Sequence, residues 1–354
     1  MSKMKIKNIL PIVLTTLFYL GLVFIMRGDK SLIYAILIIF TTLLSYPLTF
    51  YNQNVLHKLL RKPFVKIINS LNKIFKTKIK SAMLLFIRED LVPYVDYGYR
   101  NGVYIGVHTN ALVVGDYLIK YLEENNENGI KNTYEWLLNN YEDNGNYIVW
   151  KANYERPDLG LKPGWVSGLY QGRALKALCM LWERTQNRKL LDTINKGVNA
   201  FEVDIEDGGF KSNGKHGYWF EEYPGSGEQP FVLNGFVESL LDLHYVYEKM
   251  KIGKAKYLFD KGLKELHARV REFDTGSWTY YDLLKHPARF DYHQTHIREM
   301  MDMFRITGDK TFWELANKWS KYKKADWRFY IINTSILNTV VLMLYFVLII
   351  SQKT

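Results

Sequence analysis

The chain has 354 residues, of which 48% are hydrophobic and 23% are charged, and this balance excludes a disordered, collagen-like or coiled-coil protein. A single cysteine, Cys179, excludes both a disulfide framework and a metal site built from several cysteines. The formal net charge of +11 is unevenly distributed, because residues 1–80 carry +12 whereas residues 81–317 carry −6. A nucleic-acid-binding protein would carry its positive charge on the folded body, so we expect no nucleic-acid partner.

Three apolar runs near the two ends of the chain predict transmembrane helices. They cover residues 9–26, 32–50 and 329–350. Crossing the hydrocarbon core takes roughly 17–25 helical residues, and each run is long enough. We therefore predict a transmembrane hairpin over residues 1–50 and a C-terminal transmembrane helix over residues 327–354. The alternative for the first run is a cleaved signal peptide, which the second run and the lack of a small-residue cleavage motif disfavour.

Basic residues flank these runs and predict their sidedness. Residues 58–80 hold eight lysines and arginines, and residues 318–328 hold five more. Cytoplasmic flanks of membrane proteins carry such an excess, so we predict an integral, multi-pass membrane protein with its body on the cytoplasmic face. The segment 51–80 also alternates apolar with basic residues. We interpret it as an amphipathic helix on an anionic membrane surface, with a solvated basic linker as the alternative.

The body, residues 81–326, is predicted to be mainly helical. Apolar residues recur with the period of a helix in segments that come in pairs, and short links within a pair imply antiparallel neighbours. The links recur every 55–66 residues, which indicates an internal repeat of about four helical hairpins. The predicted fold is an α/α toroid, an incomplete α/α-barrel. The predicted pairs are 111–124 with 132–141, 165–184 with 189–203, 231–250 with 254–270, and 293–306 with 311–323.

The links between hairpins are long and differ in character from those within them. They cover residues 142–164, 204–230 and 271–292, and each contains glycine turns and alternating aromatic residues. This pattern predicts small β-hairpins, and residues 81–110 are expected to add a few strands. Long ordered loops in a compact domain are usually functional, so we expect the site at the end of the toroid where these links gather.

The links combine aromatic residues with acids, histidines and an arginine. Aromatic faces pack on sugar rings while polar groups bind hydroxyls, so this composition predicts a carbohydrate ligand. Five short sequence motifs then occur in an order that resembles the C-terminal domain of the D-glucuronyl C5-epimerase family, over roughly residues 140–323. They are Gly164-Trp165 with Gln171-Gly172, Glu221-Glu222-Tyr223-Pro224, Phe231-Val232-Leu233-Asn234-Gly235-Phe236, Tyr281-Asp282-Leu283, and Asp291-Tyr292-His293-x-Thr295-His296.

The resemblance implies an isomerase that converts D-glucuronate into L-iduronate residues in a heparan-sulfate-like glycan, without a cofactor. Its partner would be a uronate-containing polysaccharide or a lipid-linked glycan. It implies that Tyr223, Tyr281 and Tyr292 are the functional tyrosines and that Glu222 is the carboxylate beside them. The reaction needs acid/base groups on both faces of the sugar, because the C5 proton leaves from one face and another arrives on the opposite face.

The resemblance also suggests substrate-binding residues. The family has an arginine three residues after the tyrosine of its Tyr-Asp-Leu motif, and Leu284 occupies that position in this chain. We therefore expect other side chains to hold the substrate carboxylate. The candidates for this role are Lys285 and Arg289, with His293 as a further cationic neighbour. Asn234 is expected either to bind a sugar hydroxyl or to cap a turn. Trp165 and Gln171, from the first matching motif, are further substrate-binding candidates.

Other interpretations stay open. His293 and His296 have the spacing of a metal-binding pair, but no third ligand stands out, so no metal is expected. A uronate lyase, a glycoside hydrolase, an inactive member of the family and a non-catalytic glycan-binding scaffold are the alternatives. A hydrolase needs two carboxylates at a set separation, and strand alternation would point Glu221 and Glu222 to opposite faces. The oligomeric state stays open, with a homodimer among the alternatives.

Overall fold

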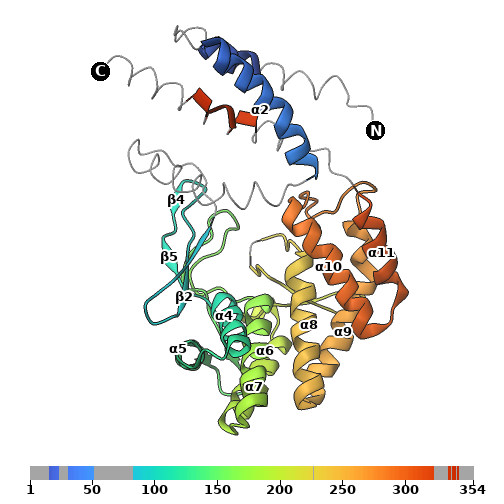
Figure 1. The fold of residues 1–354 in the computed structure, drawn as a ribbon. Coiled ribbons are helices and arrows are strands. Elements are labelled where there is room, and N and C mark those ends of the chain that lie inside the picture. The colour runs from blue at the N-terminus through green and yellow to red at the C-terminus, as the bar shows by residue number, and fades with distance from the viewer. Residues whose placement is uncertain are drawn as a thin grey trace. The chain divides into compact units, whose positions relative to one another are not determined.

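The computed structural model describes residues 16–23, 31–51, 83–225, 227–322, 334–335, 337–339 and 341–342 (Figure 1). The chain divides into two compact units, one made of Met1–Phe64 with Lys324–Thr354 and the other of Val65–Lys323. Apart from Tyr51, the predicted amphipathic segment 51–80 lies outside the described residues.

Helical segments make up the described part of the smaller unit, and the longest is α2 (Ser31–Tyr51). A small apolar cluster of Val23, Tyr34, Ala35, Ile38 and Val341 holds them together. Polar side chains also meet between the segments. They form hydrogen bonds between Tyr19 and Thr339 (2.8 Å), Thr41 and Asn338 (2.5 Å), and Asn338 and Thr42 (3.1 Å).

The described helices contradict one prediction. In the described ranges, no helix combines the length and the hydropathy that a bilayer crossing requires. This contradicts the predicted localisation as a multi-pass membrane protein, and the cytoplasmic placement of the body, which depended on those spans, falls with it. The structure describes the first predicted span only over residues 16–23, and the side chains of the second only from Leu32 to Thr42. The boundaries predicted at residues 50 and 327 are not tested.

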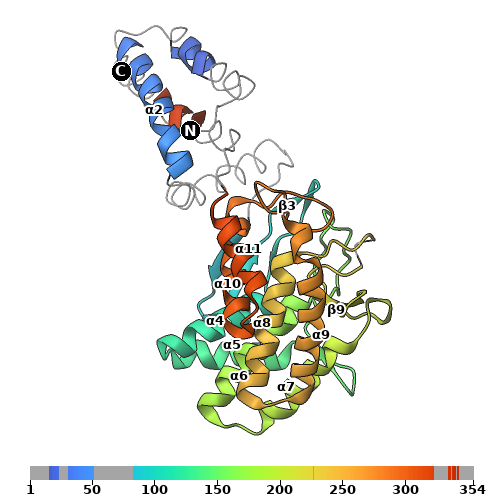
Figure 2. The same cartoon turned by 90° about the vertical axis from the view of Figure 1, so that its right-hand side faces the viewer.

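The larger unit contains the four predicted helical hairpins (Figures 1 and 2). In every pair a few residues join two helices, which confirms the interpretation of the repeat. The hairpins are α4 (Ala111–Glu124) with α5 (Glu127–Asn139), α6 (Gly168–Thr185) with α7 (Lys189–Asn199), α8 (Leu233–Met250) with α9 (Gly253–Arg269), and α10 (Phe290–Thr307) with α11 (Lys310–Ser320).

The first helix of each hairpin ends in the same way. Asn125, Gln186, Lys251 and Gly308 follow these helices, and each has a positive φ, between 52° and 69°. A residue in this left-handed conformation turns the chain out of the helix while its N–H still bonds a carbonyl of the last turn. Only one of the four is a glycine, so the repeat is conserved in geometry rather than in residue type.

The second helix of the first hairpin begins earlier than the sequence pattern predicted. The Asn126 side chain accepts a hydrogen bond from the Gly129 N–H at 3.0 Å and so caps α5 at its start. Gly129 was expected to lie in the turn, but it belongs to the helix. A Cβ at this position would lie 2.5 Å from the Tyr121 ring, so glycine serves close packing here.

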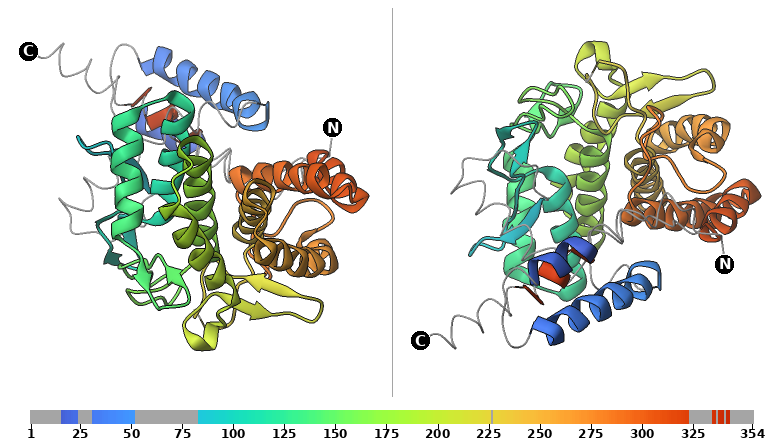
Figure 3. Two further views of the ribbon diagram at one scale, coloured as in Figure 1. Left: turned by 90° about the horizontal axis from the view of Figure 1, so that it is seen from below. Right: turned by 90° about the horizontal axis from the view of Figure 1, so that it is seen from above.

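The first helices of the hairpins pack side by side in chain order, and each second helix packs on its own partner (Figure 3). Arg173 on α6 joins three of them, because its guanidinium forms ion pairs with Asp116 on α4 and with Glu238 (2.6 Å) and Asp242 (3.0 Å) on α8. Asp242 is completely buried. Lys176 also pairs with Asp242, with Nζ 3.3 Å from Oδ1, so loss of Arg173 would leave this buried carboxylate with one cation instead of two.

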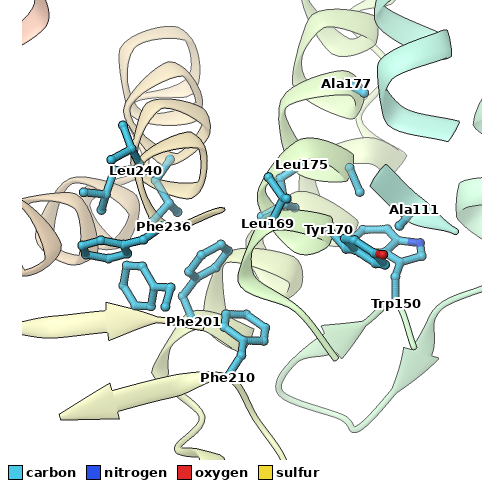
Figure 4. Close-up of a cluster of buried hydrophobic side chains, with 14 of the residues drawn as sticks. Ala111, Trp150, Leu169, Tyr170, Leu175, Ala177, Phe201, Phe210, Phe236 and Leu240 are labelled. Carbon is cyan, nitrogen blue, oxygen red and sulfur yellow. The ribbon is translucent and has the colours of Figure 1, made fainter. Parts of the chain in front are cut away.

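An aromatic cluster joins these helices to the links that carry the site (Figure 4). Phe201 lies with its ring centroid 4.9 Å from both Phe210 and Phe220, and Phe236 of α8 lies 5.9 Å from Phe220. All four are completely buried. Burial of such rings contributes roughly 1.5–3 kcal/mol each, and it fixes the second long link against α6 and α8.

Short strands confirm the small β-hairpins predicted in two of the three links. The third link has only isolated bridges, which pair Asp274 with Thr279 and Tyr280 with Pro287. The described part of this unit also has three short 3-10 helices, at Ala200–Glu202, Ile205–Asp207 and Val270–Phe273. The strands are β1 (Leu84–Ile87), β2 (Pro93–Asp96) and β5 (Val107–His108) in an antiparallel sheet of order β1-β2-β5, and the hairpins β3 (Tyr99–Arg100) with β4 (Val103–Tyr104), β6 (Glu142–Asp143) with β7 (Ile148–Val149), and β8 (Lys211–Asn213) with β9 (Tyr218–Phe220).

Candidate active site

The four candidate catalytic residues come from three segments and meet in one place. Glu222 and Tyr223 directly follow β9, Tyr281 lies in the third long link, and Tyr292 lies in the first turn of α10. The Tyr281 and Tyr292 rings are 4.7 Å apart between centroids, at an angle of 62°. The hydroxyls of Tyr223 and Tyr281 lie close enough to the Glu222 carboxyl to lower its pKa. The three tyrosines are only half-buried.

Backbone hydrogen bonds hold the segments in register. The Gly168 N–H donates to the Glu221 carbonyl at 2.9 Å, which ties the start of α6 to the residue before Glu222. The Leu233 N–H donates to the Tyr281 carbonyl at 3.1 Å, and the Leu283 N–H donates to the Pro230 carbonyl at 2.9 Å. The second and third links are therefore joined beside the site.

Glu222 lies against the first turn of α8, where Gly235 makes room for it. A Cβ on Gly235 would lie 2.5 Å from Glu222 Oε2 and 2.7 Å from its Cβ. Only glycine permits this approach. The N-terminal end of a helix also favours a carboxylate, so the position helps the ionised form of Glu222.

Burial sets the protonation states of the four groups. It raises the pKa of Glu222 to about 7, although hydrogen bonds from Tyr223 and Tyr281 and the positive charge of Arg156 oppose the shift. Burial, with the nearby Glu222, raises the pKa values of all three tyrosines above the ordinary 10. At neutral pH the tyrosines are neutral phenols, and Glu222 is the one of the four that ionises near pH 7.

Two arginines lie over two of the tyrosine rings. The Arg289 guanidinium is 5.0 Å from the Tyr292 ring centroid and pairs with Asp291, with Nε 3.1 Å from Oδ1. The Arg156 guanidinium is 5.3 Å from the Tyr223 ring centroid. Arg289 was predicted from its place in the third link. Arg156 was not predicted, because it lies 67 residues before Tyr223 in a link whose sequence carries no signal of the contact.

Trp165 and Asn234 lie beside the four central residues. The Trp165 ring is 5.9 Å from the Tyr223 ring between centroids, and its Nε1 donates to the Tyr154 carbonyl at 2.9 Å. Asn234 directly precedes Gly235 in α8 and is 8% exposed, and its Oδ1 has no hydrogen-bond partner among the described residues. Both positions agree with the predicted contact with substrate, which stays a prediction.

Three other predicted substrate-binding residues are held by contacts within the protein. Gln171 Nε2 donates to the Ile148 and Gly197 carbonyls, at 2.9 Å each, and the side chain is buried. Lys285 is exposed, donates to the Glu272 carbonyl at 3.2 Å and lies over the Tyr280 ring. His293 is completely buried. Their binding of substrate stays a prediction, and the side chains of Gln171 and His293 are buried.

Thr279 lies between the buried side chains of His293 and His296. Its Oγ1 is 2.9 Å from His293 Nδ1 and 3.1 Å from His296 Nδ1, and His293 Nε2 donates to the Trp319 carbonyl at 3.2 Å. Burial, with the neighbouring His293, lowers the pKa of His296 to about 3. In the described part of the chain, no group of three or more His, Cys, Asp and Glu could hold a metal ion.

Comparison with known proteins places this arrangement in context. The family model for the D-glucuronyl C5-epimerase C-terminus matches residues 143–321. A D-glucuronyl C5-epimerase of Caenorhabditis elegans is 30% identical over 211 residues, which cover 53% of this chain and 34% of that protein. An uncharacterised protein of Methanocaldococcus jannaschii is 35% identical over 182 residues, which cover 50% of this chain and 59% of that protein. The matches thus span about a third and three fifths of these relatives.

Solved structures of two sugar isomerases are also similar at low identity. The crystal structure of a D-mannose isomerase is 14% identical with a TM-score of 0.40, over 64% of each chain. The structure of a cellobiose 2-epimerase from Spirochaeta thermophila is 14% identical with a TM-score of 0.40, over 73% of this chain and 70% of that one.

Proposed function

Because the chain belongs to the family of D-glucuronyl C5-epimerase C-terminal domains, we propose that its larger unit is a uronate C5-epimerase that converts D-glucuronate residues of a glycan into L-iduronate residues. The observation that carries the proposal is the meeting of a buried carboxyl with two tyrosine hydroxyls, next to a third tyrosine. These are the acid/base groups that inversion at a carbon atom requires on two sides of a sugar ring.

The roles follow from the protonation states. The C5 proton of a uronate is acidified by the adjacent carboxyl group, and its removal leaves an enolate-like intermediate. Glu222 has a pKa of about 7, so at neutral pH about half of the molecules have an ionised carboxylate that can accept this proton. The tyrosines are neutral and can donate a proton to the opposite face of C5. The proton taken up by Glu222 and the one lost by the phenol balance, and exchange with water resets both groups.

Stabilisation of the intermediate needs hydrogen-bond donors that are already in place. The phenol hydroxyls and the Arg289 guanidinium meet this need without rearrangement of the backbone. We expect no cofactor, because the substrate's own carboxyl group receives the negative charge. The natural substrate would be a uronate-containing polysaccharide or a lipid-linked glycan.

The test is the incorporation of solvent deuterium at C5. Glucuronate polymers and lipid-linked oligosaccharides are incubated with the protein in deuterated water, and mass spectrometry follows both label and chain length. We expect label at C5, conversion of glucuronate to iduronate, and unchanged chain length. Shortened chains would indicate a hydrolase, unsaturated ends would indicate a lyase, and bound glycan without any label would indicate a scaffold. Each of these results contradicts the proposal.

The surroundings of the two adjacent glutamates disfavour the hydrolase. Glu221 and Glu222 are neighbours in sequence but face different surroundings: Glu221 lies near Arg269, and Glu222 lies near Tyr223 and Arg156. A hydrolase needs two carboxylates that flank one glycosidic bond. Glu221 is completely buried, so the two carboxyls do not form an accessible pair of this kind.

A further inference from the structure

A buried arginine from the first long link lies beside the acid/base groups. Arg156 is 9% exposed, and its guanidinium lies over the Tyr223 ring at 5.3 Å. Its positive charge also acts on the Glu222 carboxyl, whose pKa it lowers against the larger effect of burial. The charge is thus close to two of the four groups that the proposed reaction uses.

Interactions within the link fix the orientation of this arginine. Its Nε and Nη2 donate to the two oxygens of Asp158, at 3.0 and 3.1 Å. The Arg156 N–H donates to the Leu161 carbonyl at 2.9 Å, and the Leu161 N–H donates back to the Arg156 carbonyl at 3.1 Å. Among the described residues, Nη1 has no hydrogen-bond partner. One edge of the planar fork is therefore held by Asp158, while Nη1 keeps donors for another acceptor.

A second buried guanidinium adds positive charge to the same flank. Arg100, at the end of β3, is 3% exposed and donates to the Tyr99 carbonyl at 2.7 Å. Burial lowers its pKa, and the positive charge of Arg156 lowers it further, so the two cations are within electrostatic range of each other. The carboxylate of Asp158 acts on both guanidinium groups and offsets part of their repulsion, and an anionic ligand would lower it further.

The third link lacks the arginine that the sequence resemblance implied. Leu284 occupies the position of that arginine, and Lys285 is turned to the Glu272 carbonyl. Arg289 is present over Tyr292, but its side chain is 58% exposed and pairs with Asp291. A charge that is shielded from water acts more strongly on a developing anion than an exposed one does. Arg156 is the more buried of the two arginines in contact with the tyrosines.

We propose that Arg156 binds the carboxylate of the uronate through Nη1, on the Tyr223 side of the site, and so takes the place of the arginine that Leu284 replaces. This inference rests on the proposed function. A guanidinium at this point holds the carboxylate in the ground state. It also offsets the charge that accumulates there when the C5 proton leaves.

The test compares the binding of two ligands by four proteins. The ligands are a glucuronate-containing oligosaccharide and its carboxyl-reduced counterpart, in which each uronate is a neutral sugar. The proteins are the wild type, Arg156→Gln, Arg156→Lys and the control Arg305→Gln. Arg305 is an exposed arginine on α10 that pairs with Asp302, away from the tyrosines. Calorimetry gives each dissociation constant, and C5 deuterium exchange is measured in parallel.

We expect the wild type and Arg305→Gln to prefer the uronate. Arg156→Gln should lose about ten- to hundredfold in affinity for the uronate, as is usual for a hydrogen bond to a charged group, and bind the neutral ligand as before. Arg156→Lys should recover only part of the loss, because lysine lacks the fork. Since Arg156→Gln removes the guanidinium that pairs with Asp158, the double variant Arg156→Gln/Asp158→Asn serves as a second test. Thermal unfolding shows that each protein is folded.

The outcomes separate this inference from the proposed function. An unchanged preference for the uronate in a folded Arg156→Gln or double variant overturns the carboxylate site, as does a wild type without any preference. Loss of the preference together with a wild type that shows no C5 exchange supports the carboxylate site and refutes the epimerase. Exchange in the wild type with an unchanged preference in the variants supports the epimerase and refutes the role of Arg156.

Discussion

Replacing Glu222 with glutamine removes the one group of the four that ionises near neutral pH. Burial raises its pKa from 4.5 to about 7. At 1.36 kcal/mol for each pKa unit, this shift corresponds to roughly 3 kcal/mol against the ionised form. The residue is only 5% exposed, so screening by solvent reduces the figure little. Glutamine keeps the size and most of the hydrogen bonds of the side chain but cannot accept a proton from C5.

The raised pKa predicts the pH dependence of the wild type. If Glu222 is the base, kcat/KM for C5 exchange should rise about tenfold for each pH unit up to about pH 7 and then level off, because only the ionised form reacts. The ionised fraction is about one half at pH 7 and about 1% at pH 5. Glu222→Gln should lower kcat/KM by about 10²–10⁴-fold and should show no inflection near pH 7.

The assay measures deuterium incorporation at C5 between pH 5 and pH 9 at low substrate concentration, where kcat/KM reports on the free protein. Circular dichroism at each pH confirms that both proteins stay folded. A wild-type profile that is flat between pH 5 and pH 7 would refute the assignment of the base. So would residual exchange in Glu222→Gln that still follows a group with a pKa near 7.

Three further predictions concern neighbouring residues. Burial raises the pKa of Glu221 to about 8, so the folded state keeps a proton that the unfolded state loses above about pH 4.5, and the stability of the wild type falls as the pH rises through this window. Between pH 5 and pH 7, the free energy of unfolding of Glu221→Gln in urea should therefore rise relative to the wild type by on the order of 2.5 kcal/mol, and parallel curves of stability against pH would contradict this. Gly235→Ala should displace Glu222 and cost about 1–3 kcal/mol of stability, with loss of C5 exchange; an alanine variant with normal exchange would show that the close approach is unimportant. Tyr223→Phe and Tyr292→Phe should each reduce exchange at least tenfold in a folded protein, and near-normal exchange in both would remove them from the acid/base role.

The sequence was a good guide to the helices of the larger unit because helical signals are local. Apolar residues three and four positions apart define one face, and this pattern placed α4 and α8 within two residues of their observed bounds. The start of α5 was missed because Asn126 and Gly129 form a cap and a close contact that resemble a turn in the sequence. The prediction of a multi-pass membrane protein relied on the hydropathy of three runs and on the basic residues beside them, and the described helices contradict it.

The sequence by itself determined the family and the four hairpins, and it singled out the three tyrosines and the acid as candidates, since all of these depend on residue order and on short-range periodicity. Only the tertiary structure decided that Glu222 has a pKa of about 7, that the tyrosines stay protonated, that His293 is sealed within the packing and that Arg156 lies over Tyr223. The physical reason is that protonation depends on burial and on charges from segments far apart in the chain. No local pattern records which of those segments will meet.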